Sequence, residues 1–365
     1  MKKPCFLLAL SFGLFISSIN SVLSIAALPS ANELPDLVEK ILPGVVNISS
    51  TTLTRTQVYG MDDFFRYWGI PQERKQSSLG SGFIIDENEG LVLTNNHVVS
   101  HATEVLVSLI DKKVYNAKII GKDQKLDLAL LKIIDKSTQK TPENLTRVPM
   151  GDSDLVRIAE SVFAVGNPFS LQHSVTVGII SAKNRTIGIG PFDNFLQTDA
   201  SINPGNSGGP LFNFKGEVIG INTAIYSQTG QSGGLGFAIP VNEAKRVLED
   251  LKKYGRVPRP WLGILGERIT PSLEHYYGLS ANKGVLVYDL APRGPAGQGS
   301  IRVGDIISSI EGTETLDTQA VERVLEKRRP KDKIKVTLQR GAKTLTLTLT
   351  LSELPPLDNL PQGII

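Results

Sequence analysis

Three side chains in this sequence, supplied by separate segments, have the types needed for nucleophilic hydrolysis. The candidate nucleophile is Ser207, which lies in the glycine-rich stretch of residues 205–209. Glycines on both sides let the backbone adopt positive φ and turn its N–H groups toward one point, which suits a developing oxyanion. A serine hydroxyl is a weak nucleophile and needs a base and a group that orients the base. The rest of the chain therefore has to supply a histidine and a carboxylate.

His97 and Asp127 are the candidates for these two roles. His97 ends an apolar, β-branched run, and Asp127 stands between two leucines that would bury it. The chain order histidine, aspartate, serine is that of chymotrypsin and differs from the orders in subtilisin and in the α/β-hydrolases. We therefore predict that Ser207 attacks a peptide carbonyl, that His97 moves the proton and that Asp127 orients the histidine.

Each of these residues also has an ordinary structural explanation. His97 could cap a strand end, Asp127 could bond nearby backbone, and Ser207 could be a loop serine among glycines. Residues 205–209 also match the G-x-S-x-G string of lipases, but that fold needs its histidine after the serine. The only later histidine is His275, in a segment of another kind. The three local contexts together favour a catalytic triad.

The chain resembles the HtrA/Deg family of serine proteases in six blocks. These blocks are residues 94–99, 127–132, 166–169, 174–181, 198–210 and 236–240. The resemblance runs from about residue 34 to about residue 354. It implies a mainly β fold, a chymotrypsin-like double β-barrel protease domain followed by one PDZ domain. The triad would lie in the cleft between two packed six-stranded barrels.

Residues near the triad are predicted to bind the substrate. The backbone N–H groups of Gly205 and Ser207, with Asn206 as a further donor, are expected to receive the oxyanion. By correspondence with the family, Ile202 and Ile225 would be walls of the primary specificity pocket. Two branched aliphatic side chains make such a pocket small and apolar. It would favour valine, alanine or a similar residue before the scissile bond.

Local patterns agree with this architecture. Between residues 80 and 239, short β-branched and apolar runs alternate with glycine, asparagine, aspartate and proline, which indicates a domain of β-barrels. Residues 241–254 have an amphipathic pattern that stops at Gly255, which predicts a helix, and a proline-stiffened linker follows. The predicted domains are a trypsin-like serine protease domain at residues 35–255 and a PDZ domain at residues 261–352.

About the last hundred residues carry the PDZ resemblance, with supporting blocks at residues 295–297 and 302–305. A PDZ domain adds a peptide strand to the edge of its sheet and captures the peptide's C-terminal carboxylate on loop N–H groups. Residues 318–327 would form the helix of the peptide groove. The carboxylate loop would consist of Trp261, Leu262, Gly263 and Ile264.

Composition and the amino terminus restrict the classes of function. The chain has 365 residues, 41% apolar and 21% charged, and its net charge of +3 does not suggest a nucleic-acid partner. Residues 1–26 join an initial positive charge to an apolar, charge-free stretch and are predicted to be a signal peptide, with an N-terminal membrane anchor as the alternative. The only cysteine, Cys5, lies in this segment, so the mature chain would have no disulfide and no cysteine nucleophile.

The family resemblance also implies partners and a location. The aromatic cluster at residues 61–68 either folds back on the core or contacts another subunit, and in this family the N-terminal segment packs protomers into trimers. We therefore expect a homotrimeric, periplasmic protease of stress response and protein quality control, with membrane association if its N-terminus is retained. Hydrophobic C-terminal peptides would bind its PDZ domain. No phosphate-cradling motif is present, so neither ATP nor another cofactor or metal is expected.

Two questions remain open at this level. A single PDZ domain and a short polar linker at residues 72–78 resemble the DegS-like branch, which cleaves a regulatory anti-sigma factor, whereas relatives with two PDZ domains degrade misfolded proteins more generally. By that analogy residues 183–194, with Arg185 as the polar contact, would relay PDZ occupancy to Ser207. The alternative function is a latent protease that acts mainly as a periplasmic chaperone or peptide-binding scaffold.

Overall fold

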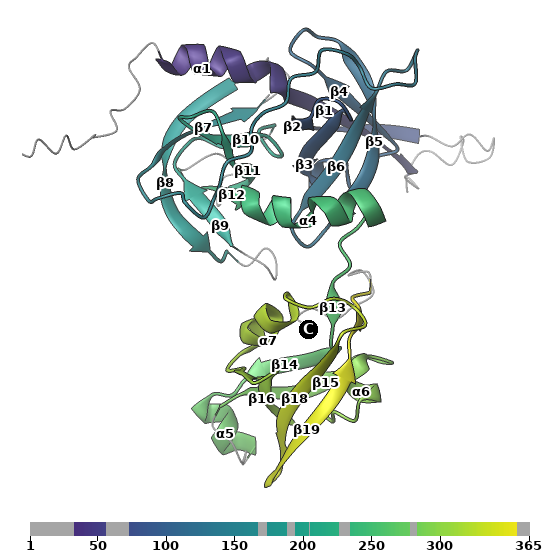
Figure 1. Cartoon of the computed structure of the whole chain (residues 1–365), viewed down its shortest axis with the longest axis vertical. Helices are drawn as coiled ribbons and strands as arrows, with labels where there is room; N and C mark the ends of the chain where they lie inside the picture. Colours follow the sequence, from purple (N-terminus) through teal and green to yellow (C-terminus); the bar gives the residue numbers. More distant parts are fainter. Residues whose placement is uncertain are drawn as a thin grey trace, which may run out of the picture.

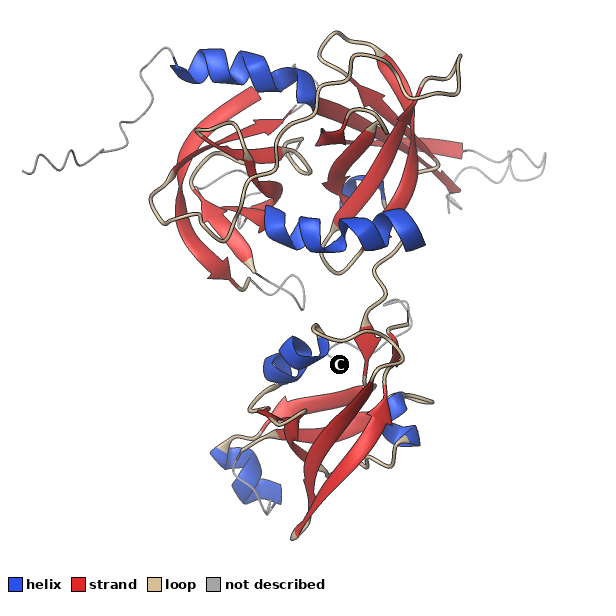
Figure 2. Ribbon diagram, viewed as in Figure 1, coloured by secondary structure: helices blue, strands red, loops and turns tan. Residues whose placement is uncertain are grey.

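The computed structural model describes residues 33–55, 73–166, 174–187, 194–203, 205–225, 234–277 and 283–355. The predicted signal peptide and the aromatic cluster at residues 61–68 lie outside these ranges. Strands dominate the described structure, and helices lie on the outside of the barrels (Figure 2). Within the described ranges, no helix combines the length and the apolar character needed to cross a membrane.

Two closed, antiparallel barrels of six strands each form the first part of the chain (Figure 1). The first barrel has the strand order β1-β2-β3-β6-β5-β4. Its strands are β1 (Val45–Arg55), β2 (Glu73–Asp86), β3 (Leu91–Asn95), β4 (Glu104–Ser108), β5 (Val114–Asp123) and β6 (Leu128–Ile134). Closure pairs every strand on both sides, so neither barrel has a free edge.

The second barrel has the strand order β10-β11-β12-β9-β8-β7. Its strands are β7 (Ser161–Gly166), β8 (Ser174–Arg185), β9 (Phe195–Thr198), β10 (Pro210–Asn213), β11 (Val218–Ile225) and β12 (Gly236–Pro240). The two barrels confirm the predicted chymotrypsin-like double-barrel fold.

Strand β6 shows why the sequence contains continuous apolar runs. A strand with one solvated face would instead alternate apolar and polar residues. Successive side chains of a strand point to opposite faces. Leu128 and Leu130 point into the apolar cluster between the barrels, and Ala129 and Leu131 point into the interior of the first barrel. Since both faces are buried, both must be apolar.

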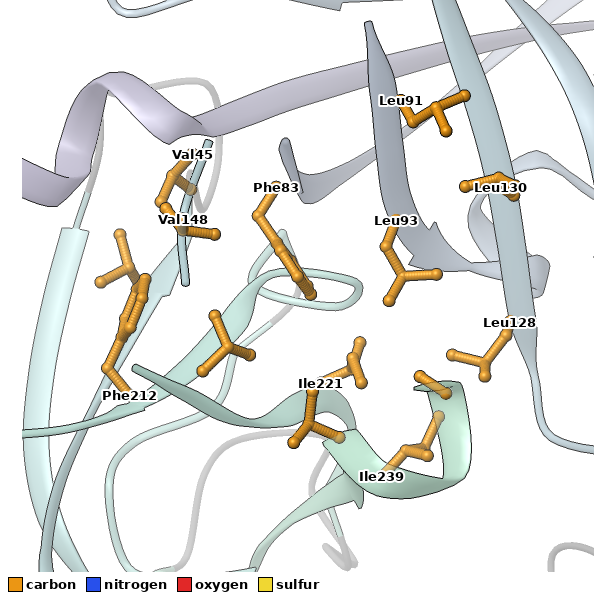
Figure 3. Close-up of a cluster of buried hydrophobic side chains, with 14 of the residues drawn as sticks. Val45, Phe83, Leu91, Leu93, Leu128, Leu130, Val148, Phe212, Ile221 and Ile239 are labelled. Carbon is orange, nitrogen blue, oxygen red and sulfur yellow. The ribbon is translucent and has the colours of Figure 1, made fainter. Parts of the chain in front are cut away.

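The cluster between the barrels is the largest shared core of the protease part (Figure 3). Phe83 and Leu93 enter it from the first barrel, and Phe212, Ile221 and Ile239 enter it from the second (Figure 3). Helix α1 (Glu33–Ile41) and helix α4 (Val241–Tyr254) contribute apolar side chains to the same cluster. The helix predicted at residues 241–254 is therefore present, and Gly255 ends it with φ of 70°.

Residues 72–78 were predicted to be a polar linker, but most of this segment is part of a strand. Residues 73–78 belong to β2, whose first half continues the hairpin with β1 and pairs Ser78 with Ser50. Polar residues are compatible with this strand because it only has to satisfy its backbone hydrogen bonds along β1.

A separate sheet forms the C-terminal part, with strand order β14-β15-β16-β18-β19 and β17 (Thr313–Glu314) paired to β16 (Figure 1). The strands are β14 (Ile264–Arg268), β15 (Val285–Leu290), β16 (Ile306–Ile310), β18 (Lys333–Arg340) and β19 (Lys343–Thr350). Strands β13 (Pro260–Trp261) and β20 (Ser352–Glu353) form a separate two-stranded sheet. The helices are α5 (Pro271–Tyr277), α6 (Pro295–Gln298) and α7 (Thr318–Leu325). Helix α7 begins at the Asp317 cap and ends two residues before the predicted end.

Ion pairs connect the C-terminal part to the barrels. The guanidinium of Arg259 donates two hydrogen bonds of 2.7 Å to the carboxylate of Asp123, which is only 4% exposed. Arg329 Nη1 lies 2.6 Å from Asp250 Oδ2 on α4. Bidentate arginine–carboxylate pairs fix orientation as well as distance.

The half-buried Lys125 lies in the same region, on the turn between β5 and β6. Burial lowers the pKa of Lys125 to about 8, although the carboxylates of Glu322 on α7 and of Glu326 at its C-cap oppose the shift. Desolvation by the surrounding protein raises the pKa of both glutamates. All three groups are therefore displaced toward their neutral forms.

We expect Lys125→Met to become less stable relative to the parent chain as pH rises from about 8 to about 10.5. In this window the unfolded lysine keeps a proton that the folded lysine, with its pKa lowered to about 8, has released, so the stability of the parent chain rises. The variant lacks this contribution. Thermal unfolding followed by circular dichroism across the window measures it, with Lys118→Met, an exposed lysine of β5, as the control. A difference that does not change with pH would contradict the expectation.

Candidate active site and peptide groove

Asp127 lies on the turn between β5 and β6 and has φ of 52°, a left-handed conformation that is uncommon outside glycine. Its carbonyl oxygen accepts hydrogen bonds from Asn96 N–H at 3.0 Å and from Asn95 Nδ2 at 2.9 Å. These bonds tie the turn to the start of helix α3 (Asn96–Val99), which carries the histidine. Hydrogen bonds to the start of α3, the helix that carries His97, thus hold Asp127 in this unusual backbone conformation.

His97 and Asp127 meet directly. The ring nitrogen Nδ1 of His97 lies 2.6 Å from Asp127 Oδ2, and the backbone N–H of His97 donates to Asp127 Oδ1 at 2.9 Å. A carboxylate can only accept, so Nδ1 carries the proton and Nε2 is left as the basic nitrogen. The His97 side chain is 49% exposed, so the imidazole is not enclosed by the protein.

Thr223 is a member of this network that the sequence analysis missed. Its hydroxyl donates to Asp127 Oδ2 at 2.9 Å, and its carbonyl accepts a hydrogen bond of 3.5 Å from Ser207 Oγ. Strand β11 has a register shift between Asn222 and Ala224, and such a bulge re-aims the residue inside it. Nothing in the local sequence distinguishes this threonine from others in apolar strands.

Ser207 is held from the first barrel. Ser81 on β2 donates its backbone N–H to the carbonyl of Ser207 at 2.9 Å and its hydroxyl to the carbonyl of Gly205 at 2.6 Å. The side chain of Thr94 in turn donates to the carbonyl of Ser81 at 2.7 Å. The serine loop of one barrel is therefore fixed against the strands of the other. Ser81 was also missed, because a serine in a strand has no distinctive pattern.

The glycines after the serine are required by this close approach. Gly208 has φ of 82°, and a side chain there would collide with the hydroxyl of Thr94 and the carbonyl of Ser81. A side chain at Gly209 would meet the carbonyl of Val165 on the opposite side. Only glycine lets the serine loop pass between the two barrels.

The predicted oxyanion donors are not equivalent. Among the described residues, no hydrogen bond uses the N–H of Gly205 or of Ser207. The N–H of Asn206 donates to the carbonyl of Asn203 at 2.9 Å. The turn of the loop therefore uses the N–H of Asn206 internally in this structure, and the oxyanion donors stay a prediction.

Ile202 and Ile225, the predicted pocket residues, flank the same glycine. Ile202 is 2% exposed and packs in the interior cluster of the second barrel. Ile225 is the last residue of β11 and pairs with Gly236, and a side chain on that glycine would lie 2.8 Å from Ile202 Cγ1. The side chain of Ile225 is outside the description, so the pocket remains a prediction.

Arg185, the predicted relay residue, contacts the second barrel. Its Nε donates to Gln197 Oε1 on β9 at 2.9 Å, and β9 leads into the serine loop. Residues 188–193 of the predicted relay lie outside the described ranges.

The predicted carboxylate loop enters the sheet at its edge strand, β14. The side chains of Trp261, Leu262 and Ile264 are buried, and Gly263 has φ of 80°. The carbonyls of Leu262 and Gly263 accept N–H groups from Ala296 at 2.9 Å and from Ala291 at 3.0 Å. Both carbonyls are thus turned toward the rest of the domain, and helix α7 packs beside β14.

Over the described ranges, no group of three or more histidine, cysteine, aspartate or glutamate side chains is placed to hold a metal ion.

Comparison with known proteins agrees with both parts of the fold. The family described as "Trypsin-like peptidase domain" matches residues 80–221, and the family described as "PDZ domain" matches residues 260–351. A Pseudomonas putida protein named "Probable periplasmic serine endoprotease DegP-like" is 38% identical over 361 residues, and the match covers 93% of this chain and 74% of that protein. The periplasmic serine endoprotease DegP of Salmonella typhimurium is 36% identical over 379 residues, covering 95% of this chain and 78% of that protein.

Two solved structures are similar over most of the chain. The HtrA-type protease AlgW with a decapeptide has a TM-score of 0.77 and 36% identity, covering 88% of this chain and 99% of that one. A serine endoprotease from Yersinia pestis has a TM-score of 0.69 and 34% identity, and the match covers 90% of this chain and 100% of that one. The predictions of fold, family and enzyme class are therefore confirmed, and the chain belongs to the HtrA-type serine endoproteases, with a trypsin-like peptidase domain and one PDZ domain.

Proposed function

We propose that the chain is a periplasmic, ATP-independent endopeptidase that cleaves unfolded or regulatory proteins with Ser207, His97 and Asp127. The observation that carries this proposal is the 2.6 Å contact between His97 Nδ1 and Asp127 Oδ2, with the serine loop fixed beside it by Ser81. This contact sets the histidine tautomer that a general base requires.

The chemistry follows from these positions. Ser207 Oγ rotates from the carbonyl of Thr223 toward His97 Nε2, gives up its proton and attacks the peptide carbonyl. The N–H groups of Gly205 and Ser207 bind the oxyanion, and His97 then protonates the leaving amine. Asp127 stabilises the imidazolium that forms between these steps. Ile202 and Ile225 wall a small apolar pocket for the side chain before the scissile bond.

The PDZ domain, proposed to span residues 261–352, would bind the C-termini of substrates or activators. Strand β14 is the edge of its sheet, and apolar residues of β14 and α7 belong to one core, including Ile264 and Val321. A hydrophobic C-terminal residue would bind between β14 and α7, above this core, while N–H groups of the loop would take the carboxylate. The solved AlgW structure contains a decapeptide, which supports peptide binding by this architecture.

The location and the assembly are proposed with the enzyme. Both relatives named above are periplasmic endoproteases, which agrees with a signal peptide at residues 1–26 ahead of a protease domain at residues 35–255. A homotrimer follows from the family resemblance of the N-terminal segment. The chaperone alternative is not favoured, since these relatives are named as proteases.

We expect Ser207→Ala to abolish cleavage of unfolded casein, with a loss on the order of 10⁶-fold, because no other group can replace the nucleophile. The measurement is fragment release by the chain lacking residues 1–26, with and without a peptide ending in a free hydrophobic residue. Ser137→Ala, at an exposed turn after β6, is the matched control and should cleave normally. Fragments released equally by the Ser207 variant would refute the assignment.

We expect Thr223→Val to lower kcat by about 10- to 100-fold with little change in KM. The variant keeps the shape of the side chain but loses one hydrogen bond to a charged carboxylate, typically worth about 1.5–3 kcal/mol. Thr223→Ser keeps the hydroxyl and should restore most of the rate. Steady-state kinetics on a fluorogenic peptide separates the two parameters, and an unchanged kcat in the valine variant would exclude a positioning role.

We expect Gly263→Ala to weaken peptide binding at the PDZ domain at least about tenfold, which corresponds to roughly 1.4 kcal/mol. The added methyl would meet the backbone of Gly294 at 3.0 Å in a loop with φ of 80°. Gly312→Ala is the control, since Gly312 has φ of 76° but no atoms within 4 Å of the added carbon. Fluorescence anisotropy with a labelled peptide and its C-terminal amide gives the affinities. Equal affinity of both glycine variants would argue against a carboxylate loop at this position.

A further inference from the structure

Asn95, the last residue of β3, is polar at a position whose neighbours are apolar. Leu91 and Leu93 lie on the same face of the strand and belong to the apolar cluster between the barrels. The residue opposite Asn95 on β6 is Leu128, another member of that cluster. Asn95 is itself 0% exposed. A buried amide at the end of this apolar row therefore needs an explanation other than packing.

The Asn95 amide bonds through only one of its two polar atoms. Its Nδ2 donates to the carbonyl of Asp127 at 2.9 Å. Its Oδ1 is buried and has no hydrogen-bond partner among the residues that the structure describes. Rotating the amide by half a turn would place Oδ1 against the Asp127 carbonyl, and two acceptors cannot bond each other. The network thus fixes the orientation in which Asn95 donates to Asp127.

Net stability does not favour asparagine at this position. Leaving a buried acceptor unpaired costs at least as much free energy as one neutral hydrogen bond typically contributes. A leucine side chain branches at the same carbon and would fill a similar space without an unpaired polar atom. What asparagine adds over leucine is therefore the donor that binds Asp127.

The capping of helix α3 leaves this amide available. Asn95 is the N-cap residue of α3, yet its side chain makes no capping bond. An N-cap asparagine usually accepts a backbone N–H of the first turn with its side-chain oxygen. Here Asp127 accepts these donors instead, because its carbonyl binds the N–H of Asn96 at 3.0 Å and its carboxylate binds the N–H of His97 at 2.9 Å. Asn95 in turn binds the residue that caps the helix.

The backbone of Asp127 needs such support. Its φ of 52° is disfavoured by backbone sterics for residues other than glycine. Rotating this peptide to an ordinary conformation would break both hydrogen bonds to its carbonyl. The aspartate side chain is short, so the direction of its carboxylate follows the backbone. The 2.6 Å contact between Asp127 Oδ2 and His97 Nδ1 therefore depends on this conformation.

We propose that Asn95 is a positioning residue of the reaction, whose Nδ2 holds the backbone of Asp127 in the left-handed conformation that directs the carboxylate to His97. The inference rests on the proposed roles of Asp127 and His97 in catalysis. It differs from the role of Thr223, whose hydroxyl binds the carboxylate directly. Asn95 acts on the backbone that carries this carboxylate.

Proton NMR of the purified protein tests the positioning without requiring catalysis. A proton in a short, charge-assisted hydrogen bond is strongly deshielded and resonates at low field. Among the described residues, His97 is the only histidine whose ring nitrogen bonds a carboxylate. Asn95→Leu should move this resonance to higher field or broaden it beyond detection, because the carboxylate is no longer held opposite Nδ1. Identical resonances in variant and parent would overturn the proposal, whatever the enzyme cleaves.

Steady-state kinetics on a fluorogenic peptide identifies the residue through which Asn95 acts. Asn95→Leu should lower kcat by about 10- to 100-fold with little change in KM, the size expected when a catalytic group is misplaced. In an Asp127→Asn background the carboxylate is absent, so the same substitution should lower kcat by less than about twofold further. A full additional loss in that background would show that Asn95 acts elsewhere and would overturn the proposal.

Asn213→Leu is the matched control for loss of a buried amide. Asn213 is also buried, and its Nδ2 donates to Glu217 Oε2 at 2.9 Å rather than to a residue of the triad. This variant should keep the low-field resonance even where the fold loses stability. Loss of the resonance in Asn213→Leu as well would reduce the effect of Asn95→Leu to general destabilisation and would contradict the proposal.

A second substitution covers the case in which Asn95→Leu fails to fold. Asn95→Ala removes the same donor and should also lose the resonance, and α3 should tolerate alanine because the Asn95 side chain makes no capping bond. If neither variant folds where Asn213→Leu does, Asn95 serves stability and the proposal is wrong. If the parent chain cleaves neither casein nor the peptide, the proposed function fails, while the NMR measurement still decides the positioning.

Discussion

The packing of two barrels against one apolar cluster is the constraint on which the active site depends. The nucleophile belongs to the second barrel, and the base and its carboxylate belong to the first. Neither barrel alone places Ser207 beside His97. Side chains such as Phe83 and Phe212 fill the space between the barrels, and dense packing of this kind resists small relative movements (Figure 3). The hydrogen bonds from Ser81 then fix the serine loop within that frame.

Asp127 is the point where most of the polar network converges. Its carbonyl binds the start of α3, one carboxylate oxygen binds the backbone of His97, and the other is shared by the imidazole and Thr223. A carboxylate with this many donors is held in one orientation. Asp123, the residue of β5 just before this turn, binds Arg259, so an ion pair to the linker lies close to the centre of the site in the sequence.

The differences between prediction and structure share one origin. Residues 73–78 have the composition of a linker but form a strand because β1 lies beside them. Asn206 has an N–H in a suitable stretch, but the turn of the loop uses it for Asn203. The short apolar runs predicted the barrels well, because both faces of strands such as β6 had to be buried. The sequence therefore shows which residues are buried, but it does not show which partner each backbone N–H group will bond.

The sequence by itself determined the residue types of the triad, their chymotrypsin-like order, the glycines of the serine loop and the division into barrels and PDZ domain. The glycines and the apolar runs reflect local backbone preferences and burial, which neighbouring residues encode, whereas the two barrels and the PDZ domain were implied by the resemblance of sequence blocks to the HtrA/Deg family. Only the tertiary structure selected Thr223, which is 96 positions from Asp127, and Ser81, which is 124 positions from Gly205. It also joined Arg259 to Asp123, which is 136 positions away. Contacts across such separations arise from how whole elements pack, and no short stretch of sequence contains that information.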